Sequence, residues 1–262
     1  DDGSTDNTKE LLKNLDITYI YQNNKGVSSA RNIGIKEAKN NWIAFLDSDD
    51  VWENSHITEM VEAFEIGADF YFSNHYQLNQ KKGAFERYGK INYEEHNLAT
   101  ENVYQYCGDM VKQILTGNLI GTSTVAFNAK KYKVHRFMEG LSFAGEDYLF
   151  WLDIAVKNPK ILFSNACNVS YFDGVNIFSS AKWGTVHLQS RLKDEIVFRK
   201  MVLDSYKISI QTKNILEQKI KDNEQSFLRN FVSTLIKGSF KVIPITIPYI
   251  IKNPRILLRA FR

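Results

Sequence analysis

The sequence of 262 residues lacks several features that mark whole classes of protein. Its two cysteines, Cys107 and Cys167, are too few for a disulfide scaffold, and they form no C-x-x-C or Cys/His spacing of the kind that binds zinc. It has only four prolines, three of them at positions 244, 248 and 254, and no apolar run long enough to span a bilayer. These shortages exclude a disulfide-rich secreted domain and a multi-span membrane protein, and they favour buried thiols in a reducing compartment.

The charges are nearly balanced, with 33 basic and 30 acidic residues and a net charge of +3. No basic stretch interleaved with aromatic residues occurs before the last quarter of the chain, so nucleic acid is not an expected partner. Hydrophobic residues make up 44% of the chain, which is enough for a sizeable core. We therefore expect one large α/β domain, or a catalytic domain with a helical tail.

Helical and strand-like patterns alternate through the first two thirds of the chain. Strands are expected at 17–22, 42–46, 68–78, 121–128 and 160–173, and helices at 7–15, 28–39, 54–65, 101–115 and 146–157. This alternation predicts βαβ units and a mostly parallel sheet flanked by helices. A polar stretch at 79–100 indicates an insertion or β-ribbon, and the chain becomes helical and charged from about residue 184.

Acidic residues follow the apolar strand "WIAFL" directly, in the stretch "FLDSDDV". Asp47 and Asp49 would lie at the carboxyl edge of the sheet, where ligands bind in open α/β folds. Two such carboxylates can hold Mg²⁺ or Mn²⁺ together with phosphate oxygens. The same stretch also fits the D-x-D-x-[TV] nucleophile loop of haloacid-dehalogenase-like phosphatases. That alternative requires a later acid pair after a strand, whereas Glu146 and Asp147 open a helix.

Four motifs occur in an informative order: "DDGSTD" at 1–6, "NNKGVSSARNIGI" at 23–35, "FLDSDD" at 45–50 and "GEDYLFW" at 145–151. Together they resemble the family 2 glycosyltransferases over roughly residues 1–175. The resemblance implies a GT-A (Rossmann-like) fold that uses nucleotide-diphospho-sugars. In that family a strand and a helix precede the "DDGSTD" turn, so we expect an N-terminally truncated chain that binds its donor weakly.

The resemblance also implies roles for single residues in the donor site. Asp2, with Asp1 as a helper, would lie near the base and ribose, while Gly26 would let the chain turn close to the nucleotide. Local chemistry offers Asp2 a plainer role as a helix cap. The other implied donor and metal residues are Arg31 near the base or diphosphate, Asp47 near the ribose or a metal-bound water, and Asp49 as the metal ligand.

The "ED" motif would supply the catalytic groups. The resemblance implies that Asp147 takes the proton of the acceptor hydroxyl and that Glu146 orients its neighbours, in a single displacement with inversion that depends on Mn²⁺ or Mg²⁺. The alternative is that both acids merely complement the helix N-terminus. A further segment around 171–187 resembles the part of related enzymes that closes over the donor, with Trp183 as a donor contact and His187 as a third metal ligand.

The expected organisation is a catalytic domain at 1–180, a helical extension at 181–236 and a basic, apolar tail at 237–262. The tail holds six basic residues and no acids, which suits the headgroup region of an anionic membrane. We therefore expect a single-addition transferase that acts on a glycan or lipid-linked acceptor in surface polysaccharide biosynthesis. It would be cytoplasmic or peripheral at the inner face of the bacterial membrane. The alternatives are a phosphatase and an inactive nucleotide- or carbohydrate-binding fragment.

Overall fold

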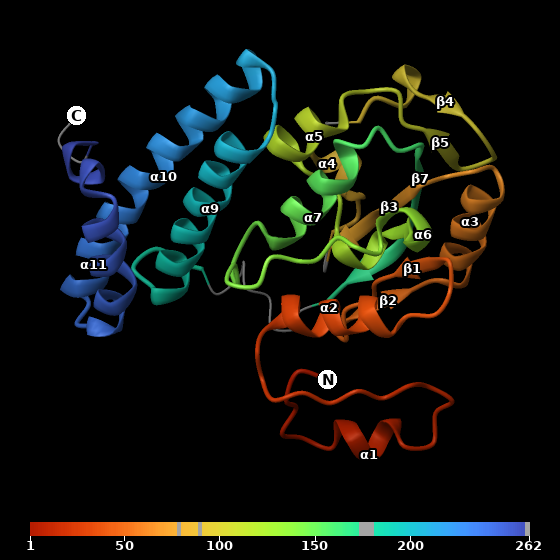
Figure 1. Cartoon of the computed structure of the whole chain (residues 1–262), viewed down its shortest axis with the longest axis horizontal. Helices are drawn as coiled ribbons and strands as arrows, with labels where there is room; N and C mark the ends of the chain where they lie inside the picture. The colour runs from red at the N-terminus through yellow and green to blue at the C-terminus, as the bar shows by residue number, and fades with distance from the viewer. Residues whose placement is uncertain (78–79, 89–90, 173–180, 260–262) are drawn as a thin grey trace.

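The structure is a computed structural model that describes residues 1–77, 80–88, 91–172 and 181–259. An α/β body occupies one end of the long axis, and a helical arm extends toward the other end (Figure 1). The strands are β1 (Trp42–Ala44), β2 (Asp50–Trp52), β3 (Phe70–Gln77), β4 (Asn97–Leu98), β5 (Val103–Gln105), β6 (Ala126–Asn128) and β7 (Ile161–Tyr171). The body helices are α1 (Thr8–Leu12), α2 (Val27–Glu37), α3 (Asn54–Glu65), α4 (Ala84–Tyr88), α5 (Met110–Gly117), α6 (Ala129–Tyr132) and α7 (Glu146–Ala155), with short 3₁₀ turns η1 (Tyr93–Glu95) and η2 (Thr122–Thr124). The arm contains α9 (Val186–Ser205), α10 (Ile210–Ile236), η3 (Phe240–Val242), α11 (Ile243–Lys252) and η4 (Pro254–Arg259).

One mixed sheet forms the centre of the body. Its strands follow the order β1-β6-β3-β7-β5-β4, and β2 pairs with β7 off this path. The α/β class with flanking helices is confirmed, but the expectation of mostly parallel pairing is not. Among the described residues only β3 and β7 run parallel, and the other pairs are antiparallel. One reason is local: β4 and β5 are joined by a connection of four residues, which is too short for a parallel crossover.

The two faces of the sheet carry different helices. Phe70 and Phe72 of β3 point into the main core, which also contains residues of α2, α5 and α7. Tyr71, on the opposite face, packs with Met60 and Ala63 of α3. This alternation is the period of a strand buried on both sides. Because α2 and α7 cover the same face, residues from these two helices can meet over one edge of the sheet.

The helical arm shares a core with the body. Phe198 and Val202 of α9 pack in one cluster with Leu149 and Leu152 of α7. The ring of Phe198 meets that of Tyr148 edge-on, with 5.5 Å between centroids. Further along the arm, α9 and α10 pack with Tyr249 of α11. None of the helices in the described ranges combines the length and apolar character needed to cross a bilayer.

The N-terminal segment differs from expectation. The expected helix at 7–15 is the shorter α1, and the expected strand at 17–22 is wrong, since these residues join no strand of the sheet. Their ladder is limited to Asp1, whose amino group donates to Ile20 O (2.9 Å) and whose carbonyl accepts from Gln22 N (3.0 Å). A strand needs a neighbour along its length, and Figure 1 places α1 on the far side of α2 from the sheet.

Two expectations in the middle of the chain are corrected as well. The expected helix at 101–115 begins instead at Met110, where Asp109 caps the first turn by accepting from Lys112 N at 2.9 Å. The residues before it include β5, which pairs with β4; only β4 lies within 79–100, where an insertion or β-ribbon was expected, and the described part of that stretch also contains α4 and η1. The expected strand at 121–128 is limited to β6, because residues 122–124 form a tight 3₁₀ turn. The helices at 54–65 and 146–155 and the strand at 161–171 confirm the sequence predictions closely.

Candidate active site

The acidic loop after β1 is held in place by one buried serine. Ser123, which is fully buried, accepts a hydrogen bond from Asp47 N (3.0 Å) and donates one to Asp50 Oδ2 (2.5 Å). Its carbonyl accepts from Trp52 Nε1 at 2.6 Å. The 3₁₀ turn that contains Ser123 therefore holds the main chain of the loop in place and leaves the carboxylates of Asp47 and Asp49 for other contacts.

Arg31 of α2 connects this loop to the N-terminus of α7. Its Nη2 donates to both carboxylate oxygens of Asp47, at 2.7 and 2.9 Å, and its Nη1 lies 3.8 Å from Glu146 Oε1. The guanidinium also lies over the ring of Phe137, 5.3 Å from its centroid. Only 12% of the Arg31 side chain is exposed, so this residue does not belong to a solvated helix face. One cation thus brings three of the four motifs to one place.

The pKa values of the two acids at the start of α7 are both raised. Burial and the adjacent Glu146 carboxylate raise the pKa of Asp147 to about 8, against opposing effects of the Tyr148 amide and Arg31. Burial likewise raises the pKa of Glu146, with Asp194 and Asp47 adding to the effect while Arg31 opposes it. Asp147 also accepts from Tyr148 N at 2.8 Å. A carboxyl group whose pKa lies near neutrality suits general base catalysis better than an ordinary aspartate does.

Helix α9 holds the loop that precedes this acid pair. Asp194, which is 1% exposed, accepts hydrogen bonds from the amides of Ser142 and Phe143, both at 3.0 Å. These amides belong to the loop that leads into α7. Gly145, directly before the acids, has φ +95°, and a Cβ there would lie 2.6 Å from Phe198 Cβ. The close approach of α9 therefore requires glycine at this point.

The N-terminal motif at residues 1–6 forms its own set of hydrogen bonds. Asp2 accepts hydrogen bonds from Gln22 Nε2 (2.5 Å), Lys25 N (2.8 Å) and Gly26 N (2.9 Å). Burial opposes its ionisation, but these donors outweigh burial and hold the pKa of Asp2 below its usual value. Asp1 accepts from Ser4 N at 2.8 Å and from the Tyr19 hydroxyl. Asp2 thus ties the first turn to the loop before α2, next to Gly26, which starts that helix with φ +94°.

The acidic loop concentrates negative charge at its open side. Burial, with the neighbouring carboxylates of Asp49 and Asp47, raises the pKa of Asp50 to about 6, although Ser123 donates to it. Asp49 is exposed, and no hydrogen bond joins it to another described residue. An added cation would relieve this repulsion, so the donor set suits a hard divalent ion that completes its shell with phosphate oxygens and water. Of the three acids in this loop, Asp49 has the carboxylate that is most accessible to an added ion.

The expected metal trio does not assemble here. Among the described residues no group of three His, Cys, Asp or Glu side chains is placed to hold a metal ion. Asp47 is occupied by Arg31. His187 is exposed at the start of α9, with its ring 6.1 Å from that of Phe143. Trp183 is 50% exposed, and its carbonyl accepts from Lys237 Nζ at 2.8 Å. Residues 173–180 of the expected closing segment lie outside the described ranges.

Sequence reasoning missed Ser123, Phe137 and Asp194. No motif marks them, because they act through the main chain or through Arg31 and come from segments far along the chain. Of these three residues, only Asp194 has a feature in the sequence that could have predicted its role. It stands in "RLKDEIVF", at a helix position whose neighbours one turn away are buried, and a buried acid there needs donors.

Replacing Arg31 by Lys is expected to weaken donor binding and to destabilise the fold by about 1–3 kcal/mol, the range for lost hydrogen bonds to charged groups. Lysine presents a single ammonium and cannot reach Asp47 and Glu146 together. Urea unfolding and nucleotide titration would measure the two effects. Arg191→Lys, which alters an ion pair with Glu195 within α9, is the matched control with an expected loss of about 0.5 kcal/mol or less. Equal losses in both variants would contradict a special role for Arg31.

Comparison with solved structures identifies the fold. The chain aligns with the crystal structure of S. aureus TarS 1-349 over 88% of its own length and 60% of that chain, with a TM-score of 0.51 and 17% identity. A second structure of S. aureus TarS gives a TM-score of 0.54 over 93% of this chain and 43% of that one, with 15% identity. The similarity confirms the predicted GT-A architecture.

Comparison with known sequences points the same way. A Rickettsia felis protein named as an uncharacterized glycosyltransferase is 33% identical over 164 residues, which are 60% of this chain and 25% of that protein. The Escherichia coli protein WfaP, named as a UDP-Glc:alpha-D-GlcNAc-diphosphoundecaprenol beta-1,3-glucosyltransferase, is 29% identical over 75% of this chain and 72% of its own length. This chain thus spans about a quarter of the Rickettsia relative.

The family comparison decides between the alternatives for the acidic loop. Residues 1–128 match the family described as Glycosyl transferase family 2, and this match includes "FLDSDDV". The phosphatase alternative would use Asp47 as its nucleophile, whose oxygens both accept from Arg31. The chain carries a domain of glycosyltransferase family 2.

Proposed function

We propose that this protein transfers a sugar from a UDP-sugar to a hydroxyl group of a glycan or lipid-linked acceptor, with inversion, in surface polysaccharide biosynthesis. The observation that carries the proposal is the contact of Arg31 with both Asp47 and Glu146, which joins helix α2, the acidic loop after β1 and the acid pair of α7. The E. coli relative WfaP is named as a UDP-Glc:alpha-D-GlcNAc-diphosphoundecaprenol beta-1,3-glucosyltransferase, which supports the choice of donor and acceptor class.

Asp147 is the proposed general base. Its pKa, raised by burial and by Glu146 to about 8, would let it hold the proton that the acceptor hydroxyl loses as that oxygen attacks the anomeric carbon. Glu146 would keep Arg31 oriented, and Arg31 would stabilise the negative charge of the departing nucleoside diphosphate. The bond to the sugar would break as the new glycosidic bond forms, without a covalent sugar–enzyme intermediate.

The proposed donor site extends from these groups toward the N-terminus. Asp1, Asp2 and Gly26 would surround the base and ribose, and Trp183 would contact the bound donor from the start of the arm. Asp49 would hold Mn²⁺ or Mg²⁺ together with phosphate oxygens and water, and the ion would supply positive charge to the diphosphate when bound. A lipid-linked acceptor would bring the protein to the cytoplasmic face of a bacterial membrane.

Calorimetric titration of UDP is the direct test of the donor site. We expect binding that requires Mn²⁺ and that becomes weaker by about tenfold or more in Asp49→Ala, because one ligand of a metal–phosphate bridge is then lost. Asp16→Ala, which removes an exposed acid next to α1, is the control and should bind as the parent does. Equal UDP affinity with and without metal, or in Asp49→Ala and the parent, would refute the metal-bridged donor site.

A further inference from the structure

Helix α11 is apolar on both sides, since Tyr249 and Ile250 pack into the core of the arm and isoleucines also lie on the outer side. Its inner face buries the hydroxyl of Thr246, which accepts from Gln189 Nε2 (2.8 Å) and donates to Val242 O (2.9 Å). Its outer face carries Ile243, Ile247 and Ile251, which are 39%, 40% and 72% exposed. Surface helices of globular proteins normally direct apolar residues inward and polar residues to water. The outer face of α11 is therefore built for contact with something other than water.

The three isoleucines recur every four residues, a spacing that aligns side chains along one side of a helix. Pro244 and Pro248 are also exposed on α11, and Phe240 just before the helix is 67% exposed. Single exposed apolar residues are common, but a continuous apolar helix face marks an interaction surface. We call these six residues the α11 apolar face.

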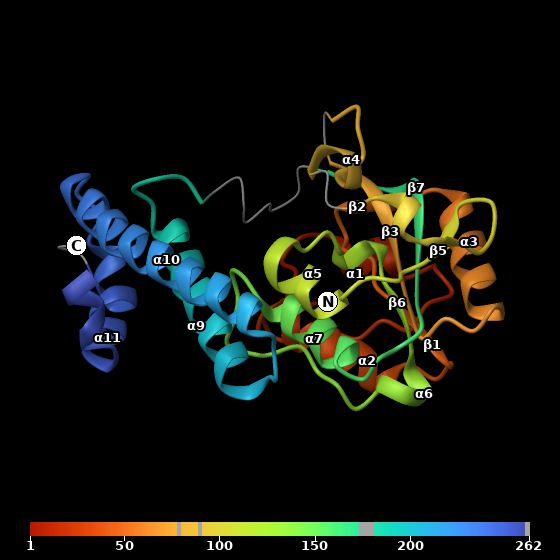
Figure 2. The ribbon, with the colours of Figure 1, turned by 90° about the horizontal axis from the view of Figure 1, so that it is seen from above.

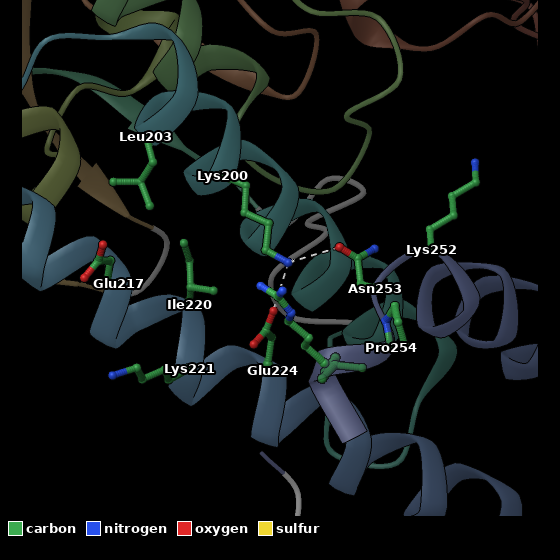
Figure 3. Close-up of a pocket in the computed structure, with 11 residues that line it drawn as sticks. Lys200, Leu203, Glu217, Ile220, Lys221, Glu224, Lys252, Asn253 and Pro254 are labelled. Carbon is green, nitrogen blue, oxygen red and sulfur yellow. Dashed lines mark hydrogen bonds and ion pairs between the residues drawn. The ribbon is translucent and has the colours of Figure 1, made fainter. Parts of the chain in front are cut away.

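The inner side of the helix is firmly attached to the arm. Lys200 of α9 lies 2.9 Å from Glu224 Oε1, and it donates to Tyr249 Oη (3.2 Å) and Asn253 Oδ1 (3.3 Å) at the end of α11. These contacts stand beside a cavity of about 630 Å³ between α9, α10 and η4. Figure 3 shows Lys200 directed toward Asn253, whereas Lys252 extends away from both. The helix cannot turn its isoleucines inward without breaking these bonds.

Charge indicates what covers the α11 apolar face. Lys241, Lys252 and Arg255 are exposed and near it in sequence, with Lys252 and Arg255 also at the edge of the cavity, and residues 237–262 contain six basic residues and no acid. A second copy of this chain would bring like charges together, which disfavours self-association through this face. An anionic lipid surface offers both an apolar layer for the isoleucines and phosphate groups for the cations. Figures 1 and 2 place α11 at the outer end of the long axis, away from the sheet.

We propose that α11 docks in the plane of an anionic membrane surface. The α11 apolar face lies at the level of the headgroups and upper acyl chains, and Lys241, Lys252 and Arg255 contact lipid phosphates. The transferase body then projects from the membrane through the arm. This contact extends the proposed function, and it can be tested without any transfer reaction, so its failure and that of the transferase proposal are distinguishable.

Co-sedimentation of the whole chain with vesicles tests the proposal. We expect binding to vesicles of phosphatidylcholine with phosphatidylglycerol, little binding to phosphatidylcholine alone, and a loss of binding as salt rises. Ile247→Asp/Ile251→Asp should weaken binding by about tenfold or more with an unchanged melting temperature. The control, Ile57→Asp/Val134→Asp, makes the same charge change at residues that are 53% and 81% exposed on the body, and it should bind like the parent.

Three results would overturn the proposal. The first is failure of the parent chain to bind anionic vesicles, and the second is equal binding by the isoleucine variant and the parent. The third is a dimer in solution that the isoleucine substitutions dissociate while vesicle binding persists, which would assign the α11 apolar face to a second copy of the chain.

Discussion

Asp147→Asn is expected to abolish sugar transfer while leaving donor binding intact. Asparagine keeps the size of the side chain and its acceptor oxygen for Tyr148 N, but it cannot take a proton from an acceptor hydroxyl. Loss of a general base typically costs about 10² to 10⁴ in rate. Transfer from a UDP-sugar to a lipid-linked or glycan acceptor measures the loss, and UDP titration by calorimetry reports the retained binding.

The same substitution should change how stability depends on pH. Burial and Glu146 raise the pKa of Asp147 to about 8, above the value of 3.8 for an ordinary aspartate. Between these values the folded state keeps a proton that the unfolded state has released, so the parent loses stability as pH rises from about 4 to about 8. The asparagine side chain cannot ionise, and the Asp147→Asn variant should therefore gain on the parent over this window, by on the order of a few kcal/mol.

Asp16→Asn is the matched control, because Asp16 is an exposed acid that changes charge in the same way. Its melting temperature should follow that of the parent at every pH. Wild-type turnover by Asp147→Asn would contradict the base assignment, whereas UDP binding without any transfer by the parent or the variant would favour the alternative of a binding fragment. A stability difference that stays constant from pH 4 to pH 8 would contradict the raised pKa.

Gly145→Ala is expected to destabilise the protein by about 2–5 kcal/mol and to reduce transfer at the same time. The residue has φ +95°, which costs a residue with a side chain about 1–3 kcal/mol, and the new methyl group would lie 2.6 Å from Phe198 Cβ. Relief of the clash moves α9 away from the start of α7 and displaces Glu146 and Asp147. Urea unfolding and a transfer assay measure the two effects.

Two other glycines separate the causes. Gly26 has φ +94° with no atom within 4 Å of a built Cβ, so Gly26→Ala should show the backbone cost alone, about 1–2 kcal/mol. Gly34 lies within α2 with open space around it, and Gly34→Ala should stabilise by about 0.5–1 kcal/mol. If Gly145→Ala cost no more than Gly26→Ala, the close packing of α9 on this turn would not matter.

Local sequence patterns predicted the elements that carry the candidate site residues, but not the contacts that these residues make. The apolar strand before Asp47 and the acids opening a helix at Glu146 are local signals, since each depends on neighbours within a few positions. Arg31 contacts Asp47, which is 16 positions further along the chain, and Glu146, which is 115 positions further. No local pattern encodes contacts of this kind. Ser123 and Asp194 could not be predicted for the same reason, because each forms hydrogen bonds with main-chain groups that only the fold brings near.

The same distinction explains the errors in the fold. Strand propensity at 17–22 was real, yet a strand exists only through its partners, and the described chain supplies only Asp1 beside it. Apolar spacing at 101–115 suggested one helix, but Val103 and Tyr104 pair with β7, and helical structure starts only where Asp109 caps it. Tertiary pairing decided these segments against their local periodicity.

The packing of α9 on α7 bears on how this protein can be divided. The match to the glycosyltransferase family ends at residue 128, before the acid pair, and the boundary expected from sequence falls near residue 180. A cut near residue 180 would remove Phe198 and Val202 from Leu149 and Leu152, and would remove Asp194 from the turn that precedes Glu146, while a cut at residue 128 would remove all of these residues from the matched part. The α/β body is therefore not packed independently of the arm. Exchange of the arm between related chains would also exchange contacts that support the candidate active site.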